Sequence, residues 1–330
     1  GRYVEGSAMA AAYGVHPPSG HAQATRRGGA PRSGPYHLGM SPPSLGMSPP
    51  SAPIAALPQV PNAPRPPVRV VAVDMDGTFL RTGSTYDRPR FERVHAAMEA
   101  AGCRLVVASG NQYEQLRSFF GPEGERMAFV SENGAMVRAG DETLFTAWLS
   151  RANSLAVLDV LEDEPEVEFI ASGPGGGFAE ESLSRQTFEE LSFYYPRMVR
   201  VPDLREVAGE LFKFSLLVPP GRADAFSARL SERLGGIVKP VTSGNVSVDL
   251  IVPGCHKASG LTRLLERWAV PASQAAAFGD SLNDREMLAM CGYGVAMGNA
   301  HPALAQDARF RAPSNNDDGV LQTLERWFLQ

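Results

Sequence analysis

The chain has 330 residues, of which 43% are hydrophobic and 20% charged, so it can bury one large core or two smaller ones. A net charge of −5 and a pI near 5.8 argue against a nucleic acid or an anionic membrane as main partner. Three widely spaced cysteines without a Cys-x-x-Cys pair are typical of reduced core residues. No apolar run is long enough to span a membrane, and no early apolar block resembles a signal peptide. We therefore expect a cytoplasmic protein with no nucleic-acid or membrane partner.

The first 67 residues differ in composition from the rest of the chain. Pro, Gly, Ala and Ser dominate, and residues 38–44 are repeated at once as residues 45–51. Such a composition cannot bury enough apolar surface to form a core, so we expect residues 1–67 to be a disordered tail. Five arginines against the single acid Glu5 leave a targeting segment as a second interpretation, although frequent prolines break the amphipathic helix that such segments need.

The remainder of the chain is organised around residues 70–78. An apolar, β-branched run ends there in Asp74-Met75-Asp76-Gly77-Thr78, which places two carboxylates two residues apart. Apolar runs of this kind are typical of strands covered on both faces, and ligands of α/β sheets bind outside the carboxyl ends of such strands. Gly77 permits a sharp turn, and Thr78 can hydrogen-bond a carboxylate or an anion. The alternative is an ordinary Asx turn, which an isolated Asp-Gly pair would favour.

Two further strands are expected to end near this one. A helix over 89–101 predicts a crossover to a parallel strand at Arg104–Ala108, which ends in Ser109-Gly110-Asn111. A hydroxyl and exposed backbone N–H groups at this position can hold a phosphate oxygen, whereas the same tripeptide elsewhere would be a simple turn. A third strand, 127–131, leads through Asn133 into a hairpin over 135–147, and Asn133 either lines the rim of the site or only turns the chain.

Residues 151–253 have shorter amphipathic elements and predict an inserted α+β module, because doubly wound elements resume after it. The run 173–177 contains four glycines but lacks the Lys-Ser or Lys-Thr of a phosphate loop, so we expect a flexible loop. Lys213, the tripeptide at residues 243–245 and Asp249 are candidates to face a substrate, although lone polar residues on half-buried strands are more often exposed to solvent. We expect helices at 155–163, 188–195 and 222–234, and strands at 167–171, 211–218, 237–241 and 246–251.

Lys257 opens the next helix, which is expected to run to Trp268. A lysine at a helix start opposes the helix dipole, and such a local conflict fits a residue kept for chemistry: a cation aimed at a phosphate or at carboxylates. His256, beside it, is a candidate acid or base, but a structural role is the preferred interpretation for a lone histidine.

A second acidic cluster follows the buried strand predicted at 275–279. Asp280 and Asp284 lie four residues apart across a strand-to-helix junction. This spacing can place Asp280 on a metal ion and Asp284 behind it, with Asn283 turned inward. A helix N-cap is the alternative role for Asp284. Short strands at 294–298 and 309–312 and a closing helix at 319–328 complete the predicted elements.

In chain order, the motifs Asp-x-Asp-Gly-Thr, Ser-Gly-Asn, Lys and Gly-Asp-x-x-Asn-Asp resemble those of the haloacid dehalogenase-like phosphatases. The insertion between the Ser and Lys motifs is similar to the Cof-type subfamily, and within it to bacterial sugar phosphatases. Residues 212–215, 239–244, 249–254 and 296–299 strengthen this resemblance, which covers about residues 68–330. It implies an α/β fold: a doubly wound parallel-sheet, Rossmann-like core at 68–150 and 254–330, and an inserted α+β cap at 151–253 that closes over the substrate.

The resemblance also implies roles for the motif residues. Asp74 would be the nucleophile that forms an aspartyl-phosphate, and Asp76 would protonate the leaving group and then activate water. Ser109 and Lys257 would bind the phosphoryl group. Mg²⁺ would be held by the Asp74 carboxylate, the Asp76 backbone carbonyl and Asp280, with Asp284 in support. Further contacts to phosphate or substrate are expected from Met75, Gly77, Thr78, Gly110, Asn111, Asn133, Lys213 and Asn283.

The expected function is Mg²⁺-dependent hydrolysis of small sugar phosphates, such as hexose or pentose phosphates. Phosphate monoesters hydrolyse extremely slowly unaided, so the site must neutralise charge and position groups. The alternatives are another small phosphate ester, such as pyridoxal phosphate or a flavin or thiamin precursor, a phosphomutase, or a non-catalytic phosphate-binding regulatory protein. An intact Asp76 disfavours the last, because binding alone needs no proton shuttle. The sequence leaves a monomer and a homodimer open.

Overall fold

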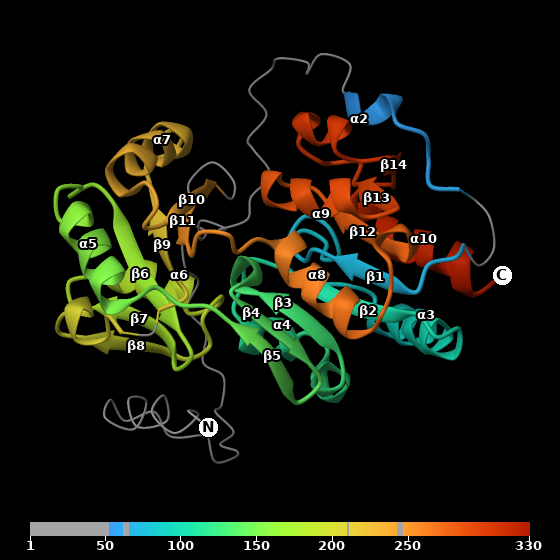
Figure 1. Ribbon diagram of the computed structural model, residues 1–330, viewed down its shortest axis with the longest axis horizontal. Coiled ribbons are helices and arrows are strands. Elements are labelled where there is room, and N and C mark those ends of the chain that lie inside the picture. The colour runs from blue at the N-terminus through green and yellow to red at the C-terminus, as the bar shows by residue number, and fades with distance from the viewer. Residues whose placement is uncertain (1–52, 62–65, 210, 243–246) are drawn as a thin grey trace, which may run out of the picture.

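The computed structural model describes residues 53–61, 66–209, 211–242 and 247–330, and its strands form two sheets (Figure 1). The eight-stranded sheet takes its strands from residues 70–146 and 275–311, on either side of the segment that forms the six-stranded sheet. We retain the limits 68–150, 151–253 and 254–330 as a proposal for the domain boundaries. None of the helices in the described residues is long and apolar enough to cross a membrane.

The eight-stranded sheet confirms the predicted α/β fold class, with parallel strands from β14 to β3 and two antiparallel strands at one edge. Its central strands carry apolar residues on both faces, and every residue of β1 and β12 is buried, as the unbroken apolar runs predict. The strands, in spatial order, are β14 (Phe310–Arg311), β13 (Tyr293–Ala296), β12 (Ala275–Gly279), β1 (Val70–Val73), β2 (Arg104–Ala108), β3 (Ala128–Ser131), β4 (Met136–Ala139) and β5 (Glu142–Thr146).

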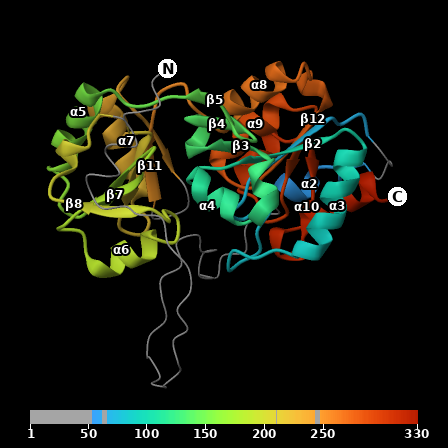
Figure 2. The same cartoon turned by 90° about the horizontal axis from the view of Figure 1, so that it is seen from below.

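Helices cover both faces of this sheet. Helices α8 (Lys257–Arg267) and α9 (Arg285–Met290) lie on one face, and α3 (Arg88–Ala100) and α10 (Gly319–Phe328) pack against each other on the opposite face (Figure 2). Helix α4 (Tyr113–Ser118), which the sequence did not predict, follows β2. Short 3-10 helices connect the elements: η1 (Gly121–Glu125), η2 (Glu132–Gly134), η3 (Leu204–Glu206), η4 (Ala272–Gln274), η5 (Leu282–Asp284), η6 (Pro302–Gln306) and η7 (Asn315–Asp317).

The six-stranded sheet has its own apolar core. Side chains that alternate along its strands, such as Phe214 and Leu216, pack with helices α5 (Arg151–Leu161) and α7 (Ala223–Leu234), while Ile170 and Leu217 belong to a smaller cluster beside α6 (Arg185–Leu191). In spatial order its strands are β10 (Lys239–Thr242), β11 (Ser247–Ile251), β9 (Lys213–Leu217), β6 (Glu168–Gly173), β7 (Gly176–Glu180) and β8 (Met198–Val201).

The glycine-rich run 173–177 differs from the flexible loop that we expected. Gly173 ends β6, and Gly176 begins β7 directly opposite it in an antiparallel hairpin. A Cβ on Gly176 would lie 1.9 Å from the backbone oxygen of Arg197, next to β8. The glycines therefore allow strands to approach closely, and they weaken the residue pattern from which β7 would be recognised.

Residues 53–61 also differ from the expected disorder, while residues 1–52 and 62–65 lie outside the described part of the chain. A short helix, α2 (Pro53–Ala56), precedes an extended segment beside β14, where Val60 N donates to Arg311 O at 3.2 Å. Ile54 and Val60 are buried in the main core, and Pro61 O accepts from the Trp327 indole at 3.2 Å. Buried apolar side chains and hydrogen bonds to β14 and Trp327 hold this segment, which the average composition of the first 67 residues does not predict.

Replacing Ile54 tests this docking. Ile54→Ala should lower the free energy of unfolding by about 2–4 kcal/mol, because it removes a buried side chain and leaves a cavity. Urea denaturation measures the change, and Ala56→Ser, at an exposed position of the same helix, serves as the control. Equal stability of the two variants would show that the segment does not pack on the core in solution.

Candidate active site

The predicted site residues follow three adjacent strands, β2, β1 and β12, at their carboxyl ends. Val73 of β1 is aligned with Val107 of β2 and with Phe278 of β12, so Ser109, Asp74 and Asp280 emerge side by side. The strands β2 and β3 follow β1 on one side, and β12, β13 and β14 follow one another on the other side. The strand order therefore reverses at β1, and ligands of α/β sheets bind at the carboxyl ends of the strands at such a switch point. The sheet topology therefore places the candidate residues together.

The loop after β1 is held close to Asp280. Gly77 has a positive φ of 75°, and a Cβ there would lie 2.4 Å from Asp280 Oδ2, so both the backbone and the available space require glycine. The Thr78 hydroxyl donates to Asp280 Oδ1 at 2.7 Å and so orients that carboxylate. The Met75 side chain is fully buried in the core, which leaves only its backbone available to a ligand.

Lys257, the first residue of α8, is buried between two carboxylates. Its Nζ donates to Asp74 Oδ1 and to Asp284 Oδ1, both at 2.6 Å, and the residue is 1% exposed. Burial alone would lower the pKa of Lys257, but the Asp284 and Asp74 carboxylates raise it above its usual value. His256 is the N-cap of α8 and forms a capping box with Ser259, in agreement with the structural role preferred for it.

Asp284 connects Lys257 to the loop after β12. Its Oδ2 accepts hydrogen bonds from the backbone N–H groups of Asp280 and Ser281, both at 3.0 Å, and its Oδ1 accepts from Lys257. The residue is completely buried. Because both oxygens already accept from protein donors, Asp284 is placed to orient its neighbours more than to bind a ligand directly.

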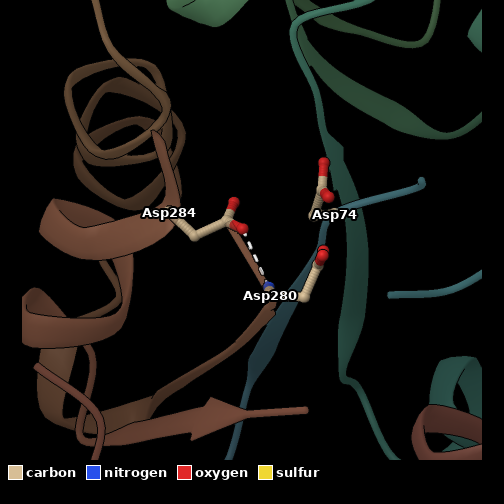
Figure 3. A group of neighbouring side chains, drawn as sticks. All are labelled: Asp74, Asp280 and Asp284. Atoms are coloured by element: carbon tan, nitrogen blue, oxygen red, sulfur yellow. Dashed lines mark hydrogen bonds between the residues drawn. The ribbon is translucent and has the colours of Figure 1, made fainter. Parts of the chain in front are cut away.

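Asp74, Asp280 and Asp284 converge from the two strand ends, and one oxygen of each lies within 4.8 Å of the others (Figure 3). Burial and the neighbouring carboxylates raise the pKa of Asp74 well above its usual value, against the opposing effect of Lys257. Burial, followed by the charge of Asp284, raises the pKa of Asp280 to about 7. One ammonium faces three acids, so this oxygen-rich set fits a hard divalent cation that would relieve the repulsion.

Asp76 lies apart from this cluster and is half-buried. Its Oδ2 accepts from Asn111 Nδ2 at 2.7 Å, and Asn111 N in turn donates to Ser109 Oγ at 3.1 Å. Burial raises the pKa of Asp76, while the Asn111 hydrogen bond lowers it by a smaller amount. The second carboxyl of the motif therefore favours its protonated form more than an exposed aspartate does.

Comparison with known proteins agrees with this geometry. The family model of haloacid dehalogenase-like hydrolases matches residues 71–324. This chain belongs to the haloacid dehalogenase-like hydrolases. It is of the Cof type, as the motifs predict, and it is a phosphoric monoester hydrolase by its relatives.

Among its relatives, this hydrolase is 39% identical to the 5-amino-6-(5-phospho-D-ribitylamino)uracil phosphatase YbjI of Escherichia coli, over 78% of this chain and 96% of that protein. It is 25% identical to the HMP-PP phosphatase of Cronobacter sakazakii, over 72% of this chain and 86% of that protein. The crystal structure of SMU.1108c from Streptococcus mutans superimposes with a TM-score of 0.76 at 31% identity, covering 80% of this chain and all of that one.

A second polar cluster of this hydrolase joins the two sheets. Asn283 Nδ2 donates to Asn133 Oδ1 at 3.2 Å, and Asn133 Nδ2 donates to Asp249 Oδ2 at 3.2 Å. Lys213 is 3% exposed and Asp249 6%, so the alternative that they face solvent does not hold. The other candidates of the same prediction, residues 243–245, lie outside the described residues. The strands of Lys213 and Asp249 are covered at this edge by η2, which the local sequence does not reveal. That Lys213 contacts a substrate stays a prediction, and in this structure its ammonium is directed at protein oxygens.

The sequence reasoning gave no role to two residues of this region. Asn299 Nδ2 donates to Gly77 O at 2.8 Å, and its Oδ1 accepts from Asn315 N, so it ties the loop after β1 to η7. Glu132 is buried and accepts from Ser172 Oγ at 2.7 Å. An asparagine following a short strand and a Gly was a visible signal for the first, whereas nothing local indicated that Glu132 is buried.

A cleft of about 410 Å³ lies between the two sheets, next to this second cluster. Its lining combines residues of the six-stranded sheet and its helix α7 with residues from the loops of the eight-stranded one, among them Lys239, Thr242, His256, Asn283 and Arg285. The lining is polar and apolar in similar measure and carries both signs of charge, which suits a ligand that has hydroxyl groups beside apolar atoms.

The crowded acids predict an unusual dependence of stability on pH. An aspartate with a raised pKa in the folded state destabilises the protein above that pKa, and the penalty disappears as the pH falls towards the unfolded value. Without divalent cations, the melting temperature should therefore be a few degrees higher at pH 5.5 than at pH 8. In Asp280→Asn this dependence should be weaker, as measured by thermal denaturation. An identical pH dependence in both proteins would contradict the account of the cluster.

Proposed function

We propose that this protein is a Mg²⁺-dependent phosphatase of small phosphate esters that works through an aspartyl-phosphate. The observation that carries the proposal is the division of tasks between the two acids of one loop. Asp74 is held by a buried ammonium, whereas Asp76 is held separately by an uncharged amide, Asn111. The buried ammonium thus favours the ionised form of Asp74 against the burial that raises its pKa, whereas Asp76 is paired only with an amide and burial favours its protonated form.

In the first step, an Asp74 oxygen forms a bond to phosphorus while the bond from phosphorus to the ester oxygen breaks. Lys257 supports this attack because its charge favours the ionised form of Asp74, against the burial that raises the pKa of that carboxyl. Asp76 gives its proton to the departing alkoxide, which is a poor leaving group without one. Ser109 and the backbone of the loops after β1 and β2 hold the phosphoryl oxygens, a role that we also propose for Gly110 and Asn111.

In the second step, the Asp76 carboxylate takes a proton from water as its oxygen attacks phosphorus, the bond to Asp74 breaks, and inorganic phosphate leaves. Bound Mg²⁺ would neutralise charge on the phosphoryl oxygens and on Asp74. It would be held by the Asp74 carboxylate, the Asp76 backbone carbonyl and Asp280. Thr78 and Asp284 orient that set, since their hydrogen bonds fix Asp280 and its backbone.

For the substrate, we propose a phosphate on the primary hydroxyl of a polyol chain. The relative with 39% identity is named for a phosphoribitylamino uracil, which makes such a flavin precursor the first candidate. Hexose 6-phosphates and pentose 5-phosphates, which belong to the class that the motifs favour, likewise carry the phosphate on a primary hydroxyl next to secondary hydroxyl groups. The cleft between the sheets, which Asn133 and Asn283 line on the side of the proposed site, is our candidate to hold the remainder of either molecule.

The setting of the enzyme is likewise a proposal. In the described residues the three cysteines are buried and unpaired, as a reducing cytoplasm would keep them. We propose either a monomer or a homodimer.

Asp74→Asn is the direct test of the proposed chemistry. It should reduce phosphate release at least about a thousandfold, because the amide is not a nucleophile, while the fold survives the isosteric change. Phosphate release is measured with and without Mg²⁺ on 5-amino-6-(5-phospho-D-ribitylamino)uracil, hexose and pentose phosphates, and pyridoxal phosphate.

Circular dichroism of the variant serves as the control for folding. The proposal would be supported if phosphate release depends on Mg²⁺ and is fastest with the phosphorylated polyols. Turnover by Asp74→Asn at the wild-type rate would refute the assignment of the nucleophile. Phosphate release that is fastest with pyridoxal phosphate would refute the proposed substrate class.

A further inference from the structure

The turn at residues 109–111 is held on two sides by hydrogen bonds to its backbone. From η2, Asn133 N donates to Ser109 O and Glu132 N donates to Asn111 O, both at 3.1 Å. From β9, in the other sheet, Lys213 Nζ donates to Gly110 O at 2.8 Å. All three carbonyl groups of the turn therefore accept a hydrogen bond, and one of these comes from the six-stranded sheet.

Lys213 is itself held firmly. Its Nζ lies 2.9 Å from Asp249 Oδ2 and 3.5 Å from Glu132 Oε2, and the Ser215 hydroxyl donates to Asp249 Oδ1 at 2.7 Å. Burial alone would lower the pKa of Lys213, but these carboxylates raise it above its usual value, so the side chain stays charged. A charged donor makes a stronger hydrogen bond to a carbonyl than a neutral one does.

The hydrogen bonds that η2 donates to the turn at 109–111 also depend on the six-stranded sheet. Glu132 and Asn133 have positive φ values of 51° and 52°, a conformation that non-glycine residues keep only where their surroundings impose it. Ser172 Oγ of β6 donates to the Glu132 carboxylate at 2.7 Å, and Asn133 donates to Asp249 of β11. Two strands of the six-stranded sheet thus fix the strained turn.

The turn at 109–111 carries side chains that take part in the proposed reaction. Asn111 Nδ2 donates to Asp76 Oδ2 at 2.7 Å, and Asn111 N donates to Ser109 Oγ. A shift of the turn would therefore move both the proposed phosphate ligand Ser109 and the proposed proton donor Asp76.

We propose that Lys213 is a positioning residue, which ties the turn at 109–111 to the six-stranded sheet and thereby sets the geometry of Ser109 and Asp76. The role rests on the proposed function. It differs from direct contact with the substrate, because Lys213 acts through the Gly110 carbonyl. Replacing a residue that binds the substrate would change the turnover of each phosphate ester according to its organic group. Replacing a positioning residue would change the turnover of every phosphate ester by the same factor.

The kinetic test compares Lys213→Met with Ser215→Ala. Both change the same buried network, but Ser215 does not touch the turn. Lys213→Met should lower kcat by about tenfold to a hundredfold, by the same factor for methyl phosphate and for a phosphorylated polyol, because small displacements of reacting groups are costly. Ser215→Ala should stay within about twofold of the wild type. A loss confined to KM for the larger substrate would overturn the proposal.

Hydrogen exchange provides a readout that needs no turnover, so it also decides the matter if the wild type releases no phosphate. The amides of residues 109–111 should exchange faster in Lys213→Met than in Ser215→Ala. If Lys213→Met does not fold, Lys213→Gln replaces it, since the uncharged glutamine amide is polar but ends one bond short of the Nζ position and so weakens the contact to Gly110 O. Exchange at 109–111 equal to that of Ser215→Ala would overturn the proposal.

Discussion

The buried ammonium of Lys257 between Asp74 and Asp284 is the interaction on which the site depends. It joins the end of β1, the start of α8 and the loop after β12, three segments far apart in the sequence. Removing one partner of such a buried pair commonly costs about 3–5 kcal/mol, because the remaining charge is left without compensation. Here the loss of Lys257 would leave three neighbouring carboxylates without a positive charge beside them. The contact that orients the proposed nucleophile therefore also offsets the repulsion within the acidic cluster.

Charge and backbone geometry act together in this site. The loop after β1 approaches Asp280 so closely that a side chain at Gly77 would collide with its carboxylate. Thr78 and Asn299 then fix the loop from both sides through hydrogen bonds to Asp280 and to the Gly77 carbonyl. The acids are thereby crowded before any cation binds, and a divalent ion would gain the free energy that is stored in their repulsion. This is how a rigid arrangement of ordinary residues can favour metal binding.

The sequence predicted the parts of this protein that depend on local pattern. The unbroken apolar runs located β1, β2 and β12, and the parallel topology then required Asp74, Ser109 and Asp280 to lie at one edge. The prediction from sequence failed where contacts between distant segments determine the structure. The strand β7 was hidden by its glycines, and the burial of Lys213 and Glu132 arises only where two sheets meet. Residues 53–61 dock through buried apolar side chains and hydrogen bonds in a segment whose average composition predicts disorder.

The central claim is that Asp74 receives the phosphoryl group and that Asp76 controls its release to water. The most direct test is peptide mapping by mass spectrometry of Asp76→Asn after rapid mixing with acetyl phosphate, whose acetate leaves without a proton from Asp76, and Mg²⁺, followed by acid quenching. The account predicts a phosphoryl group on Asp74 that persists longer than in the wild type, because asparagine cannot take a proton from the attacking water. A phosphoryl group on another residue, or turnover by this variant at the wild-type rate, would contradict it.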